Sequence, residues 1–197
     1  IGQEARSEFG ERWAPEEANP RGVLPSSLLF YARDYGRPMP FHRPAWARRF
    51  ASEADLPYRE HHTRFRSGYF WIARGGEIDI IEDNERIRRE ILAALLGLWD
   101  HIKNQGDHGA ENFALEWFGT MPAKRESRRF VGDHILTQSD VEDHVLFADR
   151  VAFGGWPIDV HPPEGINSLE PPCRQPHLKG LYNIPYRCLY SRNVPNL

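Results

Sequence analysis

The strongest periodic pattern in the chain lies between residues 84 and 104. Apolar side chains recur every four positions from Ile87 through Trp99, which is the spacing of one face of an α-helix. Asp83 is of a type that caps helix N-termini, and Gly106 is of a type that follows helix C-termini. The pattern therefore predicts a helix over residues 84–104 with its apolar face against a core.

Shorter runs along the chain predict the remaining elements. Alternating or aromatic runs bounded by glycine and proline indicate strands, and Ala-, Glu- and Arg-rich runs indicate helices. The predicted strands are residues 27–35, 69–74, 113–119, 130–137, 150–155 and 184–191, with a further extended stretch at 77–81. The predicted helices are residues 3–13 and 45–54, and a short helix beginning near Asp140 with Thr137 or Ser139 as its cap. Residues 57–67 and 156–180 are expected to be loops, the former exposed.

These strands and helices do not alternate in the regular order of a parallel β-α-β protein. That irregular order predicts an α+β fold with a mixed or largely antiparallel sheet and helices packed on it. The chain has 197 residues and no internal repeat, so one domain over residues 1–197 is expected.

Composition narrows the class of protein. Hydrophobic residues make up 40% and aromatic residues 12% of the chain, which is enough apolar surface to favour a folded core over disorder. The net charge of −3 argues against a partner that is a nucleic acid. The longest apolar stretch, Ile91 to Trp99, is far shorter than the ~20 residues of a membrane-spanning helix. No membrane span is expected.

The usual nucleotide and catalytic motifs are missing from the sequence. Gly-x-Gly occurs nowhere, so neither a dinucleotide fingerprint nor a P-loop is present, and there is no His-Glu-x-x-His zinc motif. The chain begins at Ile1 and its first methionine is Met39. We expect a piece of a longer protein. No targeting signal is visible, but the compartment stays open, with the cytoplasm slightly favoured, because a signal peptide would lie upstream of Ile1.

A basic cluster spans Lys124 to Arg129 between two predicted strands. Its cations could hold a carboxylate, a phosphate or the negative edge of a flavin through bidentate guanidinium contacts. A solvated basic turn explains the same composition.

The stretch from Gly154 to Gly165 combines paired glycines, prolines and His161. The glycines permit close backbone approach, and His161 beside a carboxylate-bearing stretch could act as a general base. A rigid surface loop in which His161 binds backbone groups is the alternative.

The aromatic residues and the other histidines carry less information. Tyr69, Phe70 and Trp71, with Trp117 and Trp156, could form the floor of a binding pocket, although core packing is the commoner use of such rings. No histidine spacing in the chain matches a metal motif, so no metal site is expected. The histidines set aside on this ground are His42, His61, His62, His101, His108, His134, His144 and His177.

Five segments of the chain together resemble a family of bacterial FAD-dependent oxidoreductases. They cover most of the sequence in order. The segments are KRESRRFVGDHILTQSDV from Lys124, SSLLFYARDYGRPMPF from Ser26, the YFWI and GGEIDIIEDNERIRREI blocks between Tyr69 and Ile91, GGWPIDVHPPEG from Gly154, and IPYRCLYSRNVPNL from Ile184.

The resemblance implies a two-part flavoprotein. In such proteins a Rossmann-like domain with Gly-x-Gly-x-x-Gly holds FAD, and an inserted α+β domain caps the flavin and shapes the substrate pocket. This chain resembles the inserted domain, so its partners would be a small-molecule substrate and the FAD-binding domain of the same polypeptide. The chain by itself is expected to be inactive, because most FAD contacts would lie outside it.

The resemblance and the residue chemistry together assign expected roles. The full protein would transfer a hydride between a small organic substrate and FAD. The expected catalytic residues are His161 as proton acceptor and Asp159 as its orienting carboxylate. The expected substrate-binding residues are Arg125, Arg128, Arg129, Trp156 and Trp71, and the expected cofactor contacts are Gly154 and Gly155.

Two other function classes stay open at this point. Tryptophans with acidic side chains suit carbohydrate, and the arginines suit an acidic ligand, so a non-catalytic binding module is one alternative. A hydrolase using His161 and a carboxylate is the other, although no nucleophile or metal set accompanies it.

Overall fold

The computed structural model describes residues 4–62, 65–66 and 68–196, and its contacts divide the chain into two compact units. Unit 1 comprises Ile1–Pro20, Arg128–Val160 and Cys173–Leu197, and unit 2 comprises Arg21–Ser127 and His161–Pro172. The expectation of one domain stays a prediction, because a division by contacts does not decide whether two units fold together.

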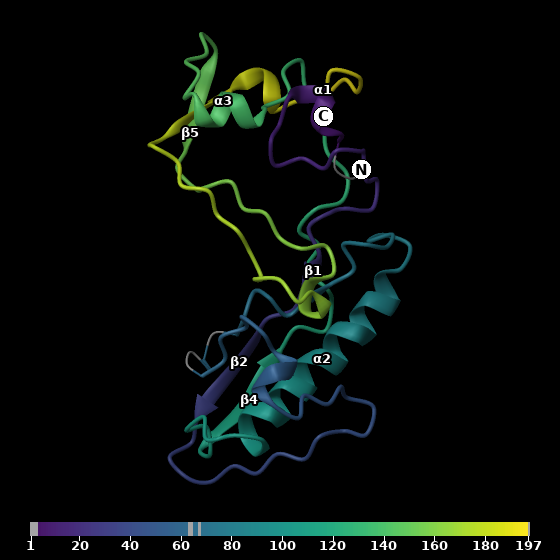
Figure 1. Cartoon of the computed structure of the whole chain (residues 1–197), viewed down its shortest axis with the longest axis vertical. Coiled ribbons are helices and arrows are strands. Elements are labelled where there is room, and N and C mark those ends of the chain that lie inside the picture. The colour runs from purple at the N-terminus through teal and green to yellow at the C-terminus, as the bar shows by residue number, and fades with distance from the viewer. Residues whose placement is uncertain (1–3, 63–64, 67, 197) are drawn as a thin grey trace. The chain divides into compact units, whose positions relative to one another are not determined.

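Unit 2 is built around the helix α2, Asn84–Asn104, the long teal ribbon in Figure 1. Its bounds are those that the apolar spacing predicts. Asp83 is the N-cap residue and Gln105 the C-cap residue, with Gly106 following. The buried face of α2 runs from Ile87 to Ile102.

Two small antiparallel sheets complete unit 2. Strand β2 (Phe30–Asp34) pairs with β4 (Phe113–Phe118), as Figure 1 shows. The register of this pair is irregular between Tyr31 and Ala32. Strand β1 (Ser26–Ser27) pairs with β3 (Ala73–Arg74). The predicted strand 27–35 is thus divided between two sheets, while the predicted strand at 113–119 is confirmed almost to its ends.

The apolar residues of α2 and of both sheets of unit 2 bury one another. Phe30 of β2 contacts the rings of Tyr69 and Trp99 edge to face. Side chains that are almost fully buried include Leu28, Phe50, Ile72, Ile87, Ile91, Leu95, Leu98, Trp99 and Ile102. This core fixes the segments that carry the candidate sites.

Unit 1 consists of short elements. They are the helices α1 (Arg6–Phe9) and α3 (Gln138–Glu142), the antiparallel pair β5 (Arg150–Gly154) and β6 (Tyr182–Pro185), and the 3-10 helix η3 (Tyr186–Cys188). Thr137 caps α3 by accepting a hydrogen bond from the Asp140 N–H, which confirms the predicted cap.

Several predicted elements are wrong. Residues 45–54 form no α-helix; the segment makes a turn and then the 3-10 helix η1 (Glu53–Asp55). The N–H of Arg48 donates to the Ala93 carbonyl on α2, so contact with that helix has replaced internal helical bonds. Residues 69–72 turn instead of extending, since the Ile72 N–H donates to the Tyr69 carbonyl.

Other predicted elements are shorter than expected or missing. The helix expected over 3–13 is limited to α1, and Gln3 lies outside the described residues. Residues 77–81 form turns. Residues 130–137 form no strand, because isolated bonds such as His134 N–H to the Arg187 carbonyl replace a ladder. The last strand ends at Pro185 and continues as η3.

The elements as a whole form an α+β fold with small antiparallel sheets, as the sequence predicts. Within the described part of the chain, no helix is both long and apolar enough to cross a membrane.

Candidate active site

The segment that carries His161 is held in unit 2 by three arginines. Arg59 donates to the carbonyl oxygens of Gly165 at 3.0 Å and Glu170 at 3.2 Å, and Arg48 donates to the Asn167 side chain at 2.6 Å. Arg74 donates to the Glu164 carbonyl at 3.1 Å. Because Arg59 and Arg74 are themselves buried, these bonds replace water for the backbone groups of the segment.

Two glycines allow the same segment to approach β3. Gly165 has a φ of 59°, and a Cβ there would lie 2.1 Å from the Ala73 carbonyl oxygen. A Cβ on Gly76 would lie 2.6 Å from the Pro163 carbonyl oxygen, to which the Gly76 N–H donates. The close approach needs glycine at both positions.

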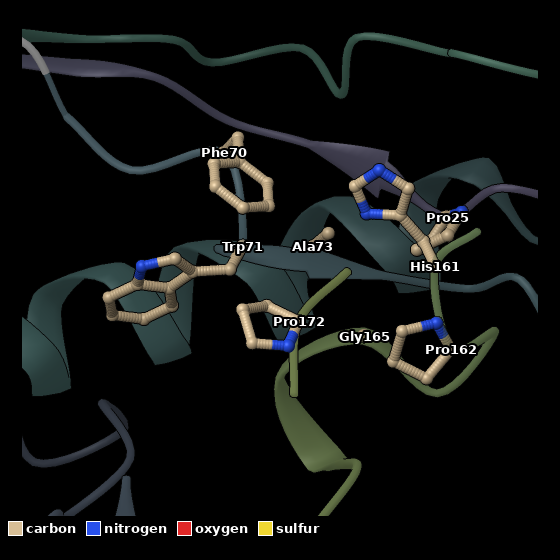
Figure 2. A pocket seen from close by; sticks show the side chains of 8 residues that line it. All are labelled: Pro25, Phe70, Trp71, Ala73, His161, Pro162, Gly165 and Pro172. Atoms are coloured by element: carbon tan, nitrogen blue, oxygen red, sulfur yellow. The ribbon is translucent and has the colours of Figure 1, made fainter. Parts of the chain in front are cut away.

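This packing leaves a pocket in front of His161. It is lined by Pro25, Phe70, Trp71, Ala73, His161, Pro162, Gly165 and Pro172. The His161 ring is buried and meets Phe70 edge to face, with ring centroids 5.7 Å apart. Figure 2 shows the Phe70 and His161 rings on one side of the pocket and the Pro162 and Pro172 rings on the other.

The pocket is small and mostly apolar. Its enclosed space holds little more than a water molecule. Trp71 is buried and stacks on Tyr69 with centroids 5.0 Å apart, so its ring forms a fixed wall. Such a pocket can surround one small apolar or hydrogen-bonding group of a substrate while His161 supplies the polar contact.

Two of the other residues expected near His161 belong to unit 1. Asp159 and Trp156 both lie there, and the Trp156 side chain is 69% exposed. The orienting role of Asp159 and the substrate contact of Trp156 therefore stay predictions.

Packing within unit 1 explains why glycine occupies positions 154 and 155. A Cβ on Gly154 would lie 2.3 Å from the Tyr182 ring on the paired strand β6, and one on Gly155 would lie 2.8 Å from the Leu181 side chain. Close packing of the hairpin thus accounts for both glycines, and their expected contact with the cofactor stays a prediction.

The basic cluster spans the boundary between the units. Arg125 belongs to unit 2, whereas Arg128 and Arg129 belong to unit 1, and all three side chains are exposed. Arg129 forms an ion pair with Glu4 at 2.9 Å. Lys124 donates to the Asn84 side chain at the start of α2 at 2.6 Å. Part of the cluster thus has structural partners.

Sequence reasoning missed a second cluster in unit 2. The rings of His61, His62, His101 and His108 gather around Glu53. These residues come from separate segments, so no spacing in the sequence marks them. One signal was present: His101 lies three residues after Leu98, on the face of α2 that the apolar pattern assigns to the core. A histidine on such a face needs a buried polar partner.

Comparison with known proteins identifies the family. The family model described as FAD dependent oxidoreductase matches residues 1–197. The chain belongs to this family. No curated protein and no solved structure matches it. FAD is thus the cofactor of the family to which the chain belongs, and the resemblance seen in the sequence is confirmed at the level of the family.

The flavin of this family fits neither the His161 pocket nor the space beside Gly154. The His161 pocket is too small for an isoalloxazine ring, and the space beside Gly154 is filled by Tyr182. In the described part of unit 2, the His161 pocket therefore does not accept the ring system of the cofactor.

Proposed function

We propose that this chain is the substrate-binding cap of a larger FAD-dependent oxidoreductase that transfers a hydride between a small organic substrate and FAD. The observation that carries the proposal is a buried histidine in a small aromatic and proline pocket, in a chain matched over residues 1–197 by an FAD-dependent oxidoreductase family. FAD, when bound, supplies the redox chemistry.

His161 is the proposed proton acceptor. Histidine is the side chain that most often serves as a general base, and here His161 is buried in a pocket that Phe70 and Pro162 also line. The bonds from Arg59 and Arg74 hold the adjoining backbone, so the ring is positioned before substrate arrives. Asp159 is proposed to orient the ring, and one or more of Arg125, Arg128 and Arg129 to hold an anionic group of the substrate.

The remaining FAD contacts are proposed to come from residues outside this chain. The sequence has no Gly-x-Gly, and the described pocket does not accept a flavin ring. Exposed apolar side chains of unit 1, among them Phe153 and Trp156, are what a surface covered by further protein would present.

The absorbance spectrum of the full-length protein tests the cofactor. A purified flavoprotein shows two bands between about 350 and 500 nm and releases a yellow cofactor on denaturation. A folded protein that stays colourless after FAD is added would overturn the proposal and favour the binding module.

A His161→Ala variant tests the proton acceptor. Small organic acids and alcohols are offered anaerobically to the flavin-loaded full-length protein, and bleaching of the flavin band identifies a substrate. With that substrate we expect the variant to bleach about 10²- to 10⁴-fold more slowly, since a general base is lost. His42→Ala, at an exposed histidine of the same unit, is the control. A His161→Ala rate equal to that of the control would exclude the role.

A further inference from the structure

Four histidine rings surround one carboxylate in unit 2. The Nε2 atom of His101 lies 3.1 Å from Glu53 Oε1, and that of His108 lies 3.5 Å from the same oxygen. The Nε2 atoms of His61 and His62 lie 3.3 and 3.5 Å from Glu53 Oε2. All these residues belong to unit 2.

The backbone fixes the proton positions on two of these rings. His61 Nδ1 lies 2.5 Å from the Arg59 carbonyl oxygen, and His101 Nδ1 lies 3.1 Å from the Phe50 carbonyl oxygen. A carbonyl only accepts, so each Nδ1 carries the hydrogen and donates it. In the neutral ring, Nε2 is then a bare lone pair facing the Glu53 carboxylate.

A different contact leaves a bare Nε2 on one of the other two rings. His62 Nδ1 and His108 Nδ1 lie 3.0 Å apart, so one of them donates to the other. The donating ring has a bare Nε2, again directed at Glu53. His108 Nε2 is also buried and makes no hydrogen bond in the described structure. Lone pairs and a carboxylate repel one another unless a cation lies between them.

The spacing of these atoms matches a metal centre. Imidazole nitrogens and carboxylate oxygens bind zinc at about 2.0–2.1 Å, and tetrahedral geometry then separates ligand atoms by about 3.3 Å. The nitrogen-to-oxygen distances around Glu53 lie between 3.1 and 3.5 Å. One ligand atom from each of Glu53, His61, His62 and His108 can be chosen so that all lie within 4.8 Å of one another.

Protonation is the competing way to relieve the repulsion, and burial opposes it. The side chains of His61 and His108 are only 1% and 2% exposed, so a charged imidazolium at either position would lose most of its hydration. Neutral imidazole is the form that binds a metal ion. The bonds from Nδ1 to backbone carbonyls are also the outer contacts that typically orient histidine ligands.

We infer that Glu53 and His61, with either His62 or His108 and with His101 as an additional donor, form a binding site for a late first-row divalent metal ion, zinc being the first choice. A nitrogen-rich set with a single carboxylate favours such an ion over Ca²⁺ or Mg²⁺, which prefer oxygen ligands. The ion joins η1, the segment around His61, the end of α2 and the loop at His108, so its role is to hold these segments together.

One side of the site is open to solvent. The side chains of Glu53 and His62 are 56% and 54% exposed, whereas those of His61 and His101 are each 1% exposed. An ion can therefore enter from the solvent side. Asp55 fixes the η1 turn that presents Glu53, by accepting from the N–H groups of Ala51 and Ser52.

Metal binding to the full-length protein, purified without a histidine tag, tests the inference. After dialysis against a chelator, the protein is titrated with Zn²⁺ in competition with a chromophoric chelator, and with Co²⁺ while visible absorption is recorded. We expect about one tightly held equivalent, cobalt bands of the intensity typical of tetrahedral coordination, and a higher Tm with Zn²⁺.

Glu53→Gln and His62→Asn are the decisive variants, because both side chains are more than half exposed and their replacement leaves the core intact. We expect Glu53→Gln to weaken Zn²⁺ binding by about 100-fold and His62→Asn by about 10-fold or more, since His62 either binds the ion or accepts the hydrogen of the ring that binds it. His42→Asn, at an exposed histidine outside the cluster, should bind as the unaltered protein does. Absence of binding, or equal affinity in all three variants, would overturn the metal site and leave a proton-linked imidazole cluster.

Discussion

The two units of the chain are stabilised in different ways. In unit 2 the helix α2 and the sheets bury a continuous apolar core that includes Ile91, Leu95 and Trp99. Among the described residues of unit 1, the buried apolar side chains are those of Val141, Phe147 and Pro185. Large apolar side chains of unit 1 that are exposed include Phe130, Leu146, Val151, Phe153, Trp156 and Leu181.

Local hydrogen bonds and ion pairs hold the elements of unit 1 together instead. Thr137 and Asp140 form a capping box on α3, His134 contacts the Asp140 carboxylate at 2.9 Å, and Arg187 pairs with Asp149 at 2.9 Å. Exposed ion pairs contribute little, whereas burial of apolar surface is the main favourable term in folding. Unit 2 should therefore carry most of the free energy of unfolding of this chain.

The largest expected effect is from a truncation in the unit 2 core. Ile91 is fully buried on α2, and Ile91→Ala should lower the free energy of unfolding by about 2–5 kcal/mol. Phe153→Ala in unit 1 removes a larger side chain, but Phe153 is 71% exposed. This variant should change the free energy of unfolding by less than about 0.5 kcal/mol. Urea unfolding followed by tryptophan fluorescence measures both.

Similar changes in the free energy of unfolding for the two truncations would contradict the difference in stabilisation between the units. A loss from Phe153→Ala that is small in this chain but large in the full-length protein would show instead that further protein covers β5.

A medium effect is expected at Gly97, in the middle of α2. Alanine normally stabilises a helix interior relative to glycine by about 1 kcal/mol. Here a Cβ would lie 2.0 Å from the Arg48 carbonyl oxygen, a backbone atom, so Gly97→Ala should destabilise unit 2 by about 1–3 kcal/mol.

Arg89 supplies the matched control on the exposed face of the same helix. There, Arg89→Ala should be more stable than Arg89→Gly, the opposite of the order at position 97. The same order at both positions, measured by thermal unfolding, would contradict the close approach of Arg48 to α2.

The smallest expected effect is a local pH dependence in unit 1. Burial alone would raise the pKa of Asp140, but hydrogen bonds from the Thr137 N–H, the His134 ring and the Thr137 hydroxyl outweigh it and leave the pKa lowered. The stabilisation of α3 is therefore complete above the unfolded pKa of about 3.9 and is lost as the pH falls through the lower folded value.

Carboxyl titration by NMR, with amide exchange in α3, measures this loss. Asp140→Asn removes the titrating group, so exchange in α3 should then no longer change over that pH range. Unaltered acid sensitivity of α3 in the variant would assign the effect to another group.

The predicted elements are confirmed where the local sequence pattern and the tertiary contacts favour the same structure. The helix α2 has its predicted bounds because an apolar face repeated over 21 residues is compatible with one element only. The helix expected over 45–54 failed because the Arg48 backbone bonds to α2 rather than to its own segment. Short segments have too few local bonds to resist such a partner.

The two candidate sites also differ in how far the sequence predicts them. His161 could be selected from the sequence because glycines and prolines surround it, and the structure places it in a pocket. The histidines around Glu53 could not, since His61 was expected in an exposed loop and is 1% exposed. Their ligand atoms converge only because α2 and the segments on either side of it pack together.

The amino-acid sequence by itself determined the α+β class, the long helix, the capped start of α3 and the resemblance to FAD-dependent oxidoreductases. These depend on residues close together in the chain or on motifs in a fixed order. Tertiary structure alone decided that unit 2 has the core, that Trp71 lines the His161 pocket and that four histidines face Glu53. Those features depend on contacts between distant residues, whose free energy comes from burial in the completed fold.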